Sequence, residues 1–154
     1  KKIIYDIGGG FIKPVKALQV GGPLGGVIPI KEVEKLNLDF QEFMKAGFML
    51  GHGGIVSIPE DFNMIKYIHH LFKFSAEESC GKCFPGRLGS YRGKEMFDQA
   101  INKTNKIPIK LLNELLITMQ KGSLCALCGA IPLPIQNILK YFTDEFKTDI
   151  NQKA

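Results

Sequence analysis

All four cysteines of this chain lie in two Cys-x-x-Cys motifs, formed by Cys80 with Cys83 and by Cys125 with Cys128. This spacing lets two thiolates face one metal centre, while the residues between them turn backbone N–H groups toward the sulfurs. Two such motifs supply four soft ligands, so we predict one metal site with four cysteine ligands. The fold must then bring together two motifs that are separated by 41 residues.

Composition favours a metal site over disulfides. A chain of 154 residues with 45% hydrophobic residues can bury a core without disulfide staples. We see no apolar secretory leader, and no apolar run approaches the ~20 residues that span a bilayer. We therefore expect a reducing environment and a chain that is soluble or at most peripheral to a membrane.

The net charge of +5 raises the possibility of a nucleic-acid partner. The basic residues, however, are spread along the whole chain and alternate with acidic residues, as at positions 31–35 and 145–147. A dispersed pattern of this kind is typical of solvated surfaces and not of a basic binding stripe. We therefore expect no nucleic-acid partner.

Residues 1–59 predict a small α+β unit. Residues 16–20 and 55–58 are strand candidates, and residues 39–46 predict a short helix. The glycine-rich loop at residues 21–26 could be taken for a phosphate-binding loop. It contains a proline and lacks a Lys-Ser/Thr ending, so we interpret it as a structural turn.

Residues 60–150 have a helical period and predict an antiparallel four-helix bundle. The helices are expected to begin at the 59–61 entry, at Arg87, at Pro108 and at Pro132. Their expected inner faces are Phe62, Ile65, Ile68 and Phe72; Leu88, Tyr91, Met96, Phe97 and Ile101; Leu111, Leu112, Leu115, Leu116 and Met119; and Ile135, Ile138, Leu139, Phe142 and Phe146. Because the second and third helices would form a hairpin, both cysteine motifs should lie at one end of the bundle.

The residues alone leave the identity of the metal open. The 41 residues between the motifs exceed the 15 to 20 or so that are typical of zinc modules, which counts against zinc without excluding it. Lys82, Arg87 and Arg92 would stabilise the negative charge of an iron–sulfur cluster, but also that of a zinc tetrathiolate. We interpret His52, His69 and His70 as surface or core residues and not as ligands.

A family resemblance narrows this choice. The residues that carry it are Glu77, Glu78, Ser79, Cys80, Gly81, Lys82, Cys83, Pro85, Arg87 and Gly89, followed by Ser123, Leu124, Cys125, Ala126 and Leu127. They resemble the C-terminal part of the flavin-bearing, NADH-binding subunit of respiratory complex I and of related NAD-linked hydrogenases and formate dehydrogenases. Residues 4–10, 21–26 and 45–54 are similar to the ubiquitin-like β-grasp domain of that subunit, here truncated at its start.

The resemblance implies a 4Fe–4S cluster. Cys80, Cys83 and Cys125 match three ligands of the family, whereas Gly86 stands at the position of the fourth. Cys128 stands where the family usually has glycine, so we interpret the two changes as compensating. The expected ligands are therefore Cys80, Cys83, Cys125 and Cys128, with zinc as the alternative metal. Residues expected to tune the cluster through N–H groups and charge are Ser79, Gly81, Lys82 and Arg87.

By the same resemblance, the glycine-rich region that binds FMN and NADH would precede everything in this chain, so we expect no FMN or NADH site and no catalysis by the chain alone. The implied function is an electron-transfer module, with a flavin-containing domain or subunit and neighbouring iron–sulfur subunits as partners. Its expected location is cytoplasmic, or peripheral on the cytoplasmic or matrix side of a membrane complex. The alternative function is a structural zinc-binding interaction module without a redox role.

Overall fold

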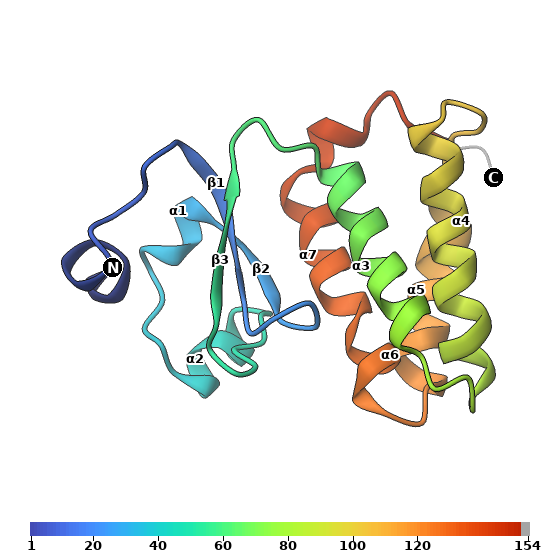
Figure 1. Ribbon diagram of the computed structural model, residues 1–154, viewed down its shortest axis with the longest axis horizontal. Coiled ribbons are helices and arrows are strands. Elements are labelled where there is room, and N and C mark those ends of the chain that lie inside the picture. The colour runs from blue at the N-terminus through green and yellow to red at the C-terminus, as the bar shows by residue number, and fades with distance from the viewer. Residues whose placement is uncertain (152–154) are drawn as a thin grey trace. The chain divides into compact units, whose positions relative to one another are not determined.

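The computed structural model describes residues 1–151, which combine helices with a small antiparallel sheet (Figure 1). This confirms the expected mixture of helix and sheet. The chain divides into two compact units, Lys1–Phe62 and the residues from Asn63 on.

The first unit contains a three-stranded antiparallel sheet in the order β2-β1-β3. The central strand β1 (Val15–Val20) pairs with β2 (Gly26–Pro29) and with β3 (Ile55–Pro59). The unit also holds the π-helical turn η1 (Ile3–Ile7) and two short helices, α1 (Ile30–Val33) and α2 (Phe40–Lys45). Its core comes from both faces of the sheet and from α2, with Leu18, Ile28 and Phe43 all buried.

The glycine-rich loop between β1 and β2 is packed closely against another segment of the first unit. A Cβ at Gly21 would lie 2.4 Å from the carbonyl oxygen of Leu50, and Gly21 has a φ of +90°. Only glycine accepts both the close approach and this backbone conformation. The packing therefore accounts for the glycines structurally, as expected for a turn.

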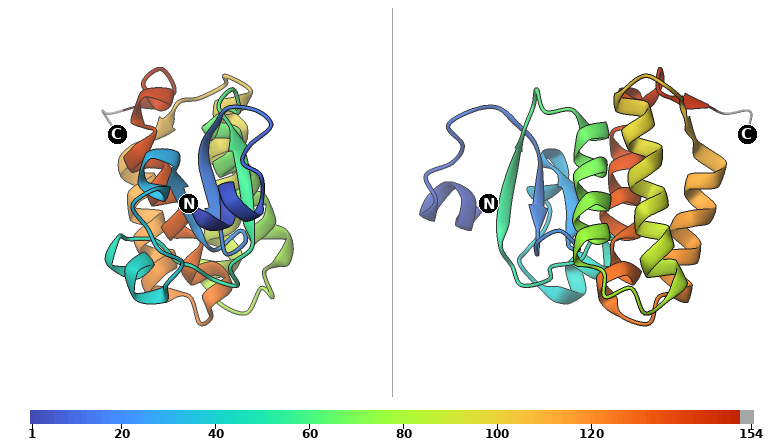
Figure 2. Two further views of the ribbon diagram at one scale, coloured as in Figure 1. Left: turned by 90° about the vertical axis from the view of Figure 1, so that its left-hand side faces the viewer. Right: turned by 45° about the vertical axis from the view of Figure 1, so that its right-hand side comes forward.

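The second unit is helical. Its elements are α3 (Met64–Glu78), η2 (Pro85–Gly89), α4 (Ser90–Ile101), β4 (Ile107–Pro108), α5 (Ile109–Gly122), α6 (Ala126–Ala130), α7 (Pro132–Tyr141), η3 (Thr143–Phe146) and β5 (Ile150–Asn151). The longer helices α3, α4, α5 and α7 lie side by side (Figures 1 and 2). The short parallel pair of β4 and β5, in which Ile107 faces Ile150, had no counterpart in the sequence-based expectations.

Helix α3 begins later than the sequence suggested. Pro59 ends strand β3, and the helix starts at Met64 with Asn63 as its N-cap. The Asn63 side chain accepts a hydrogen bond from the Lys66 N–H at 3.1 Å, and the Glu145 carboxylate accepts one from the Met64 N–H at 3.1 Å. These two acceptors satisfy N–H groups that would otherwise be unpaired at the helix start.

The expected inner face of the second helix is partly wrong. Met96 and Phe97 are buried, but Leu88 and Tyr91 are exposed by 56% and 63%. A π-helical turn, η2, precedes α4 and changes the phase of the face, so small residues such as Ser90 and Gly93 face the neighbouring helices instead. Two residues expected on other inner faces are also exposed. Leu111 on α5 is exposed by 40%, and Phe62, which lies before the start of α3, is exposed by 41%.

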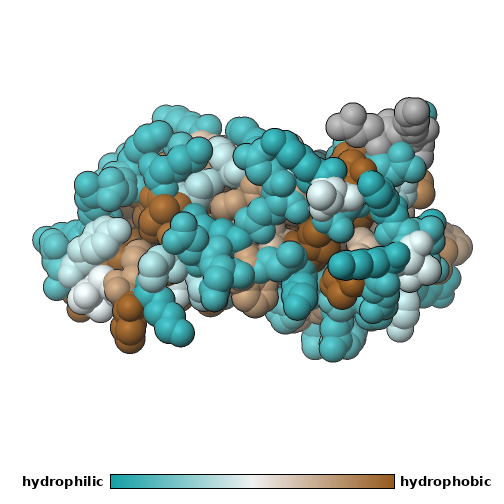
Figure 3. All heavy atoms as spheres, turned by 90° about the horizontal axis from the view of Figure 1, so that it is seen from above, coloured by the Kyte–Doolittle hydropathy of each residue, from teal (hydrophilic) through white to brown (hydrophobic). Residues whose placement is uncertain are grey.

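The surface is mostly hydrophilic on the face shown in Figure 3, with separate apolar spots between polar side chains. Within residues 1–151, none of the helices has the length and apolar character that crossing a membrane requires.

Candidate metal centre

The first cysteine motif follows the end of α3. Ser79 leaves the helix in an extended conformation, and its hydroxyl accepts a hydrogen bond from the Gly81 N–H at 3.3 Å. Gly81 has a φ of +72°, which favours glycine, and this turn brings Cys83 back toward the protein. Cys80 is exposed, whereas Cys83 is half-buried.

The chain then enters η2, where Gly86 is buried between the helices. The Arg87 N–H donates to the Cys83 carbonyl at 2.9 Å, and the Ser90 hydroxyl donates to the Gly86 carbonyl at 2.6 Å. These bonds hold the backbone of Gly86 in place next to the first motif.

The second cysteine motif lies between α5 and α7. Ser123 ends α5 in an extended conformation, and Cys125 is the residue before α6. The Gly129 N–H donates to the Cys125 carbonyl at 3.2 Å, which closes the first turn of α6. Cys128 lies within this helix and is buried, with 3% exposure, whereas Cys125 is exposed.

The two motifs meet at Gly86. A Cβ built on Gly86 would lie 3.0 Å from the Cys83 sulfur and 3.2 Å from the Cys128 sulfur. The two sulfurs therefore cannot be farther apart than the sum of these distances. Because glycine has no Cβ, both thiols reach the same point, which a side chain at this position would occupy. The structure thus brings one cysteine of each motif together.

The backbone around Cys83 favours a thiolate. The Leu124 N–H is the strongest of the donors to the Cys83 sulfur, and the Gly86 N–H adds to it. Together they lower the pKa of the Cys83 thiol below its usual value. The nearby Ser123 oxygen is buried and has no hydrogen-bond partner among residues 1–151.

Donors from the second motif thus point at a sulfur of the first. Backbone N–H groups directed at cysteine sulfurs are what an anionic thiolate centre requires, and hydrogen bonds to the sulfurs help to set the potential of an iron–sulfur cluster. The donors of Gly86 and Leu124 at the Cys83 sulfur therefore fit such a group.

The other two predicted ligands are not gathered at this point. Cys80 and Cys125 both have exposed side chains, and within the described part of the chain no group of three or more His, Cys, Asp or Glu residues is arranged to hold a metal ion. The structure therefore places the thiols of Cys83 and Cys128 close together. Cys80 and Cys125, the other cysteine of each motif, have exposed side chains.

Positive charge lies beside the first motif. The Arg87 side chain passes 3.7 Å from the position of a Cβ on Gly81, and its guanidinium lies 5.4 Å from the centre of the Phe84 ring. Lys82 is exposed between the two cysteines. Arg92 instead pairs with Glu95 on its own helix, so Arg87 and Lys82 are the cations best placed to act on the motif.

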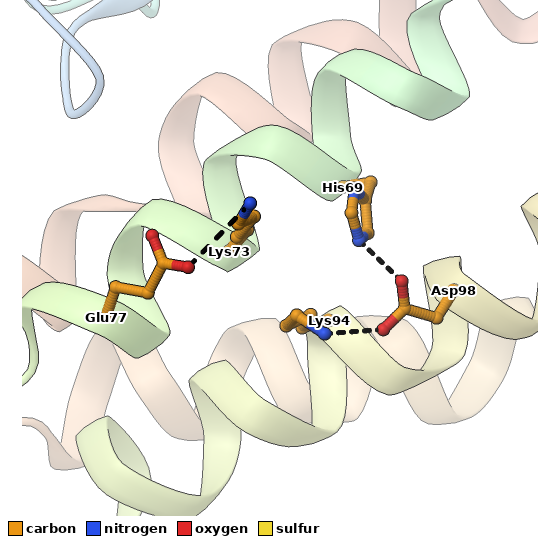
Figure 4. A network of polar contacts seen from close by, with 5 residues as sticks. All are labelled: His69, Lys73, Glu77, Lys94 and Asp98. Atoms are coloured by element: carbon orange, nitrogen blue, oxygen red, sulfur yellow. Dashed lines mark hydrogen bonds and ion pairs between the residues drawn. The ribbon is translucent and has the colours of Figure 1, made fainter.

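His69 of α3 belongs to a different cluster (Figure 4). His69 Nε2 lies 2.7 Å from an oxygen of Asp98 on α4, and the other Asp98 oxygen lies 2.7 Å from Lys94 Nζ. Lys94 is the main cause that lowers the pKa of Asp98, and His69 adds to it. Lys73 and Glu77 form a longer ion pair of 3.8 Å along α3. His69 thus links α3 to α4 and is not a ligand candidate.

Sequence reasoning missed one polar residue next to the cysteines. Ser75 on α3 is fully buried, and its hydroxyl oxygen lies 3.6 Å from the Cys128 sulfur. The available signal was its position: Ser75 follows Ile68, Leu71 and Phe72 at helical spacing, so it is a polar residue in an apolar stripe.

Comparison with known proteins identifies this region. A family model, described as the NADH-ubiquinone oxidoreductase-F iron-sulfur binding region, matches residues 66–149 and so includes both cysteine motifs. The family resemblance inferred from the motifs is confirmed, and so is the 4Fe–4S cluster as the expected cofactor.

Relatives match nearly the whole chain. The NADP-reducing hydrogenase subunit HndC of Solidesulfovibrio fructosivorans is 31% identical over 99% of this chain, and the F subunit of the NADH-quinone oxidoreductase of Rickettsia bellii (strain OSU 85-389) is 32% identical over 88%. This chain spans about a third of the length of these relatives, 32% and 33%. Both relatives are named as subunits.

A solved structure supports the fold. An NAD+-reducing NiFe-hydrogenase in the H2-reduced state matches 94% of this chain and 25% of its own chain, with a TM-score of 0.82 and 21% identity.

Proposed function

Because the chain belongs to the family of the NADH-ubiquinone oxidoreductase-F iron-sulfur binding region, we propose that it is an electron-transfer module. It receives electrons from a reduced flavin on another domain or subunit and relays them through one 4Fe–4S cluster to neighbouring iron–sulfur subunits. The chemistry that the bound cluster supplies is reversible electron uptake, which belongs to the cofactor and needs no acid, base or nucleophile from the protein.

The observation that carries this proposal is the meeting of Cys83 and Cys128 at Gly86. The resemblance to the family implies a cysteine at position 86. Here, the sulfur of Cys128 lies 3.2 Å from the point where the Cβ of such a cysteine would be. A thiol is therefore retained in this corner of the site, although it comes from a different element of the chain.

The proposed ligands are Cys80, Cys83, Cys125 and Cys128. Exposure of Cys80 and Cys125 in the described structure is compatible with this set, since each is tied to its partner by the x-x spacing of a motif. Binding would require these two side chains to turn toward the point shared by Cys83 and Cys128.

Four further residues have proposed supporting roles. Ser79 and Gly81 form a hydrogen-bonded turn around Cys80, which directs the chain from α3 toward Cys83. Arg87 and Lys82 supply positive charge beside the motif. This charge would favour the reduced, more negative form of the cluster and so raise its reduction potential.

We assign residues 1–59 to a truncated ubiquitin-like β-grasp domain and residues 60–150 to an iron–sulfur helical-bundle domain. The three-stranded antiparallel sheet with two short helices supports the first assignment. The side-by-side packing of α3, α4, α5 and α7 supports the second as an antiparallel four-helix bundle. The location proposed for the complex is cytoplasmic, or peripheral on the cytoplasmic or matrix side of a membrane.

The test is the metal content of anaerobically purified protein. We expect about four iron and four sulfide per chain, and a brown colour that bleaches on reduction, as for a 4Fe–4S cluster. A colourless protein with stoichiometric zinc would instead support the structural zinc module and overturn the redox function.

The ligand assignment has its own test. Cys128→Ser should remove most of the iron and sulfide, because a hydroxyl is a harder and weaker ligand for iron than a thiolate. The double variant Gly86→Cys with Cys128→Gly moves the thiol to the family position and should retain the cluster. The matched control is Ala100→Ser, which introduces the same hydroxyl at a buried site (5% exposed) near the far end of α4. Full cluster content in Cys128→Ser would refute Cys128 as a ligand.

A further inference from the structure

Ser75 is a buried polar residue in a position where a hydroxyl is costly. It lies in the last turns of α3 with 0% exposure, on the same apolar face as Leu71 and Phe72. A buried hydroxyl without a partner costs about 1–3 kcal/mol. Its partner here is the sulfur of Cys128, at 3.6 Å.

The direction of this hydrogen bond depends on the state of Cys128. Between a free thiol and a hydroxyl, either group can donate. A cysteine that binds iron has lost its proton and can only accept. If Cys128 is a ligand, the Ser75 hydroxyl must therefore donate to its sulfur.

We propose that Ser75 is a positioning residue for Cys128, whose O–H···S hydrogen bond orients the Cys128 sulfur and raises the reduction potential of the cluster. This inference rests on the proposed function and deepens it. Reduction adds negative charge that is shared by the ligand sulfurs, so a donor at one of them stabilises the reduced form more than the oxidised form.

The surroundings of Cys128 make this contact consequential. Cys128 is buried on a short helix, α6, and its sulfur reaches the shared point because Gly86 has no Cβ. On the opposite motif, the donors to the sulfur of Cys83 include the N–H groups of Leu124 and Gly86. The Ser75 hydroxyl gives Cys128 a donor of its own, from the helix that leads to Cys80.

The experiment compares the reduction potentials of Ser75→Ala, Ser75→Thr and unsubstituted protein, each with its iron and sulfide content measured first. Ser75→Ala should keep the cluster and shift the potential to a more negative value. A shift of the redox equilibrium by about tenfold corresponds to about 59 mV for one electron. Ser75→Thr keeps the hydroxyl and should have the same reduction potential as the unsubstituted protein.

The control is Thr143→Ala, which removes a hydroxyl that bonds the Leu139 carbonyl at 2.9 Å, away from any cysteine. It should leave the potential unchanged.

The outcomes separate the two proposals. An unchanged potential in a fully loaded Ser75→Ala variant overturns the role of Ser75 and leaves the electron-transfer function intact. Unsubstituted protein that holds no iron and sulfide overturns the proposed function, and the role of Ser75 with it. If Ser75→Ala loses the cluster, the Ser75→Thr variant tests the role of the hydroxyl. A Ser75→Thr variant that holds the cluster at the original potential supports the hydrogen bond from Ser75 to Cys128. A Ser75→Thr variant that also loses the cluster refutes it.

Discussion

Replacing Gly93 by alanine should destabilise the packing between α3 and α4. A Cβ at Gly93 would lie 2.1, 2.2 and 2.5 Å from three ring carbons of Phe72. Phe72 is fully buried, and its ring centre lies 5.8 Å from that of Phe97, which is also fully buried. Moving the Phe72 ring away from a new methyl group would therefore disturb a buried aromatic pair.

The size of the effect follows from these distances. Carbon atoms pack favourably at about 3.5–4.0 Å, so the closest contact must open by more than about 1 Å. Overpacking of this kind typically costs about 1–3 kcal/mol, and three clashing ring atoms place it near the upper end. Alanine recovers about 1 kcal/mol through its better helix propensity. We expect a net loss of about 2 kcal/mol in the free energy of unfolding.

The assay is urea unfolding of a double-mutant cycle with Phe72→Leu. This second substitution removes the ring atoms that the new methyl group would strike. In the Phe72→Leu background, Gly93→Ala should therefore be neutral or stabilising by up to about 1 kcal/mol. A cost of Gly93→Ala that is the same in both backgrounds, or below about 0.5 kcal/mol in the original one, would show that the reasoning is wrong.

Two further predictions concern the same helix pair. Asn63→Ala should lower the free energy of unfolding by about 1 kcal/mol, because it removes the cap that accepts the Lys66 N–H, while Asn63→Asp should retain most of the stability in urea unfolding. The pKa of Asp98 in the folded protein is lowered, chiefly by Lys94 and also by His69. The ion pairs of Asp98 therefore stabilise the folded protein above the unfolded pKa of about 4. This stabilisation is lost as the pH falls through the lower pKa of the folded protein. The difference in unfolding free energy between Asp98→Asn and the unsubstituted protein should therefore shrink in acid, and a difference that does not vary with pH would contradict the pairing.

The sequence was most informative where the local chemistry is strong. Residues 39–46 predicted a short helix, and the structure has α2 there, with Asp39 as its N-cap. The Asp39 carboxylate accepts hydrogen bonds from the Gln41 and Glu42 N–H groups, and Gly47 after the helix has a φ of +81°. Proline and glycine likewise placed α5 close to its observed bounds. Capping and turn residues act within a few positions along the chain, so a single sequence can reveal them.

The errors arose where tertiary packing decides. Leu88 and Tyr91 fit an apolar stripe, but the face of α4 is chosen by the close approach of Phe72 to Gly93, which only a glycine permits. A periodicity argument gives weight to large apolar residues and none to glycine. It therefore placed Leu88 and Tyr91 on the buried face by mistake, although Met96 and Phe97 were placed correctly.

The corner of the proposed cluster site shows the same distinction. The number of cysteines in the sequence predicts four thiolate ligands. It does not predict where in the fold each sulfur lies. Gly86 on η2, Cys128 on α6 and Ser75 on α3 come from three different elements and meet at one place. Taken alone, a glycine within η2 and a buried hydroxyl would each lower the stability of the fold, and a buried thiol would indicate no particular role. Together, they leave room for a sulfur, supply it and give it a hydrogen-bond donor. In the proposed ligand set, a ligand has therefore changed its position along the chain, while the packing of neighbouring elements keeps a sulfur in the same place.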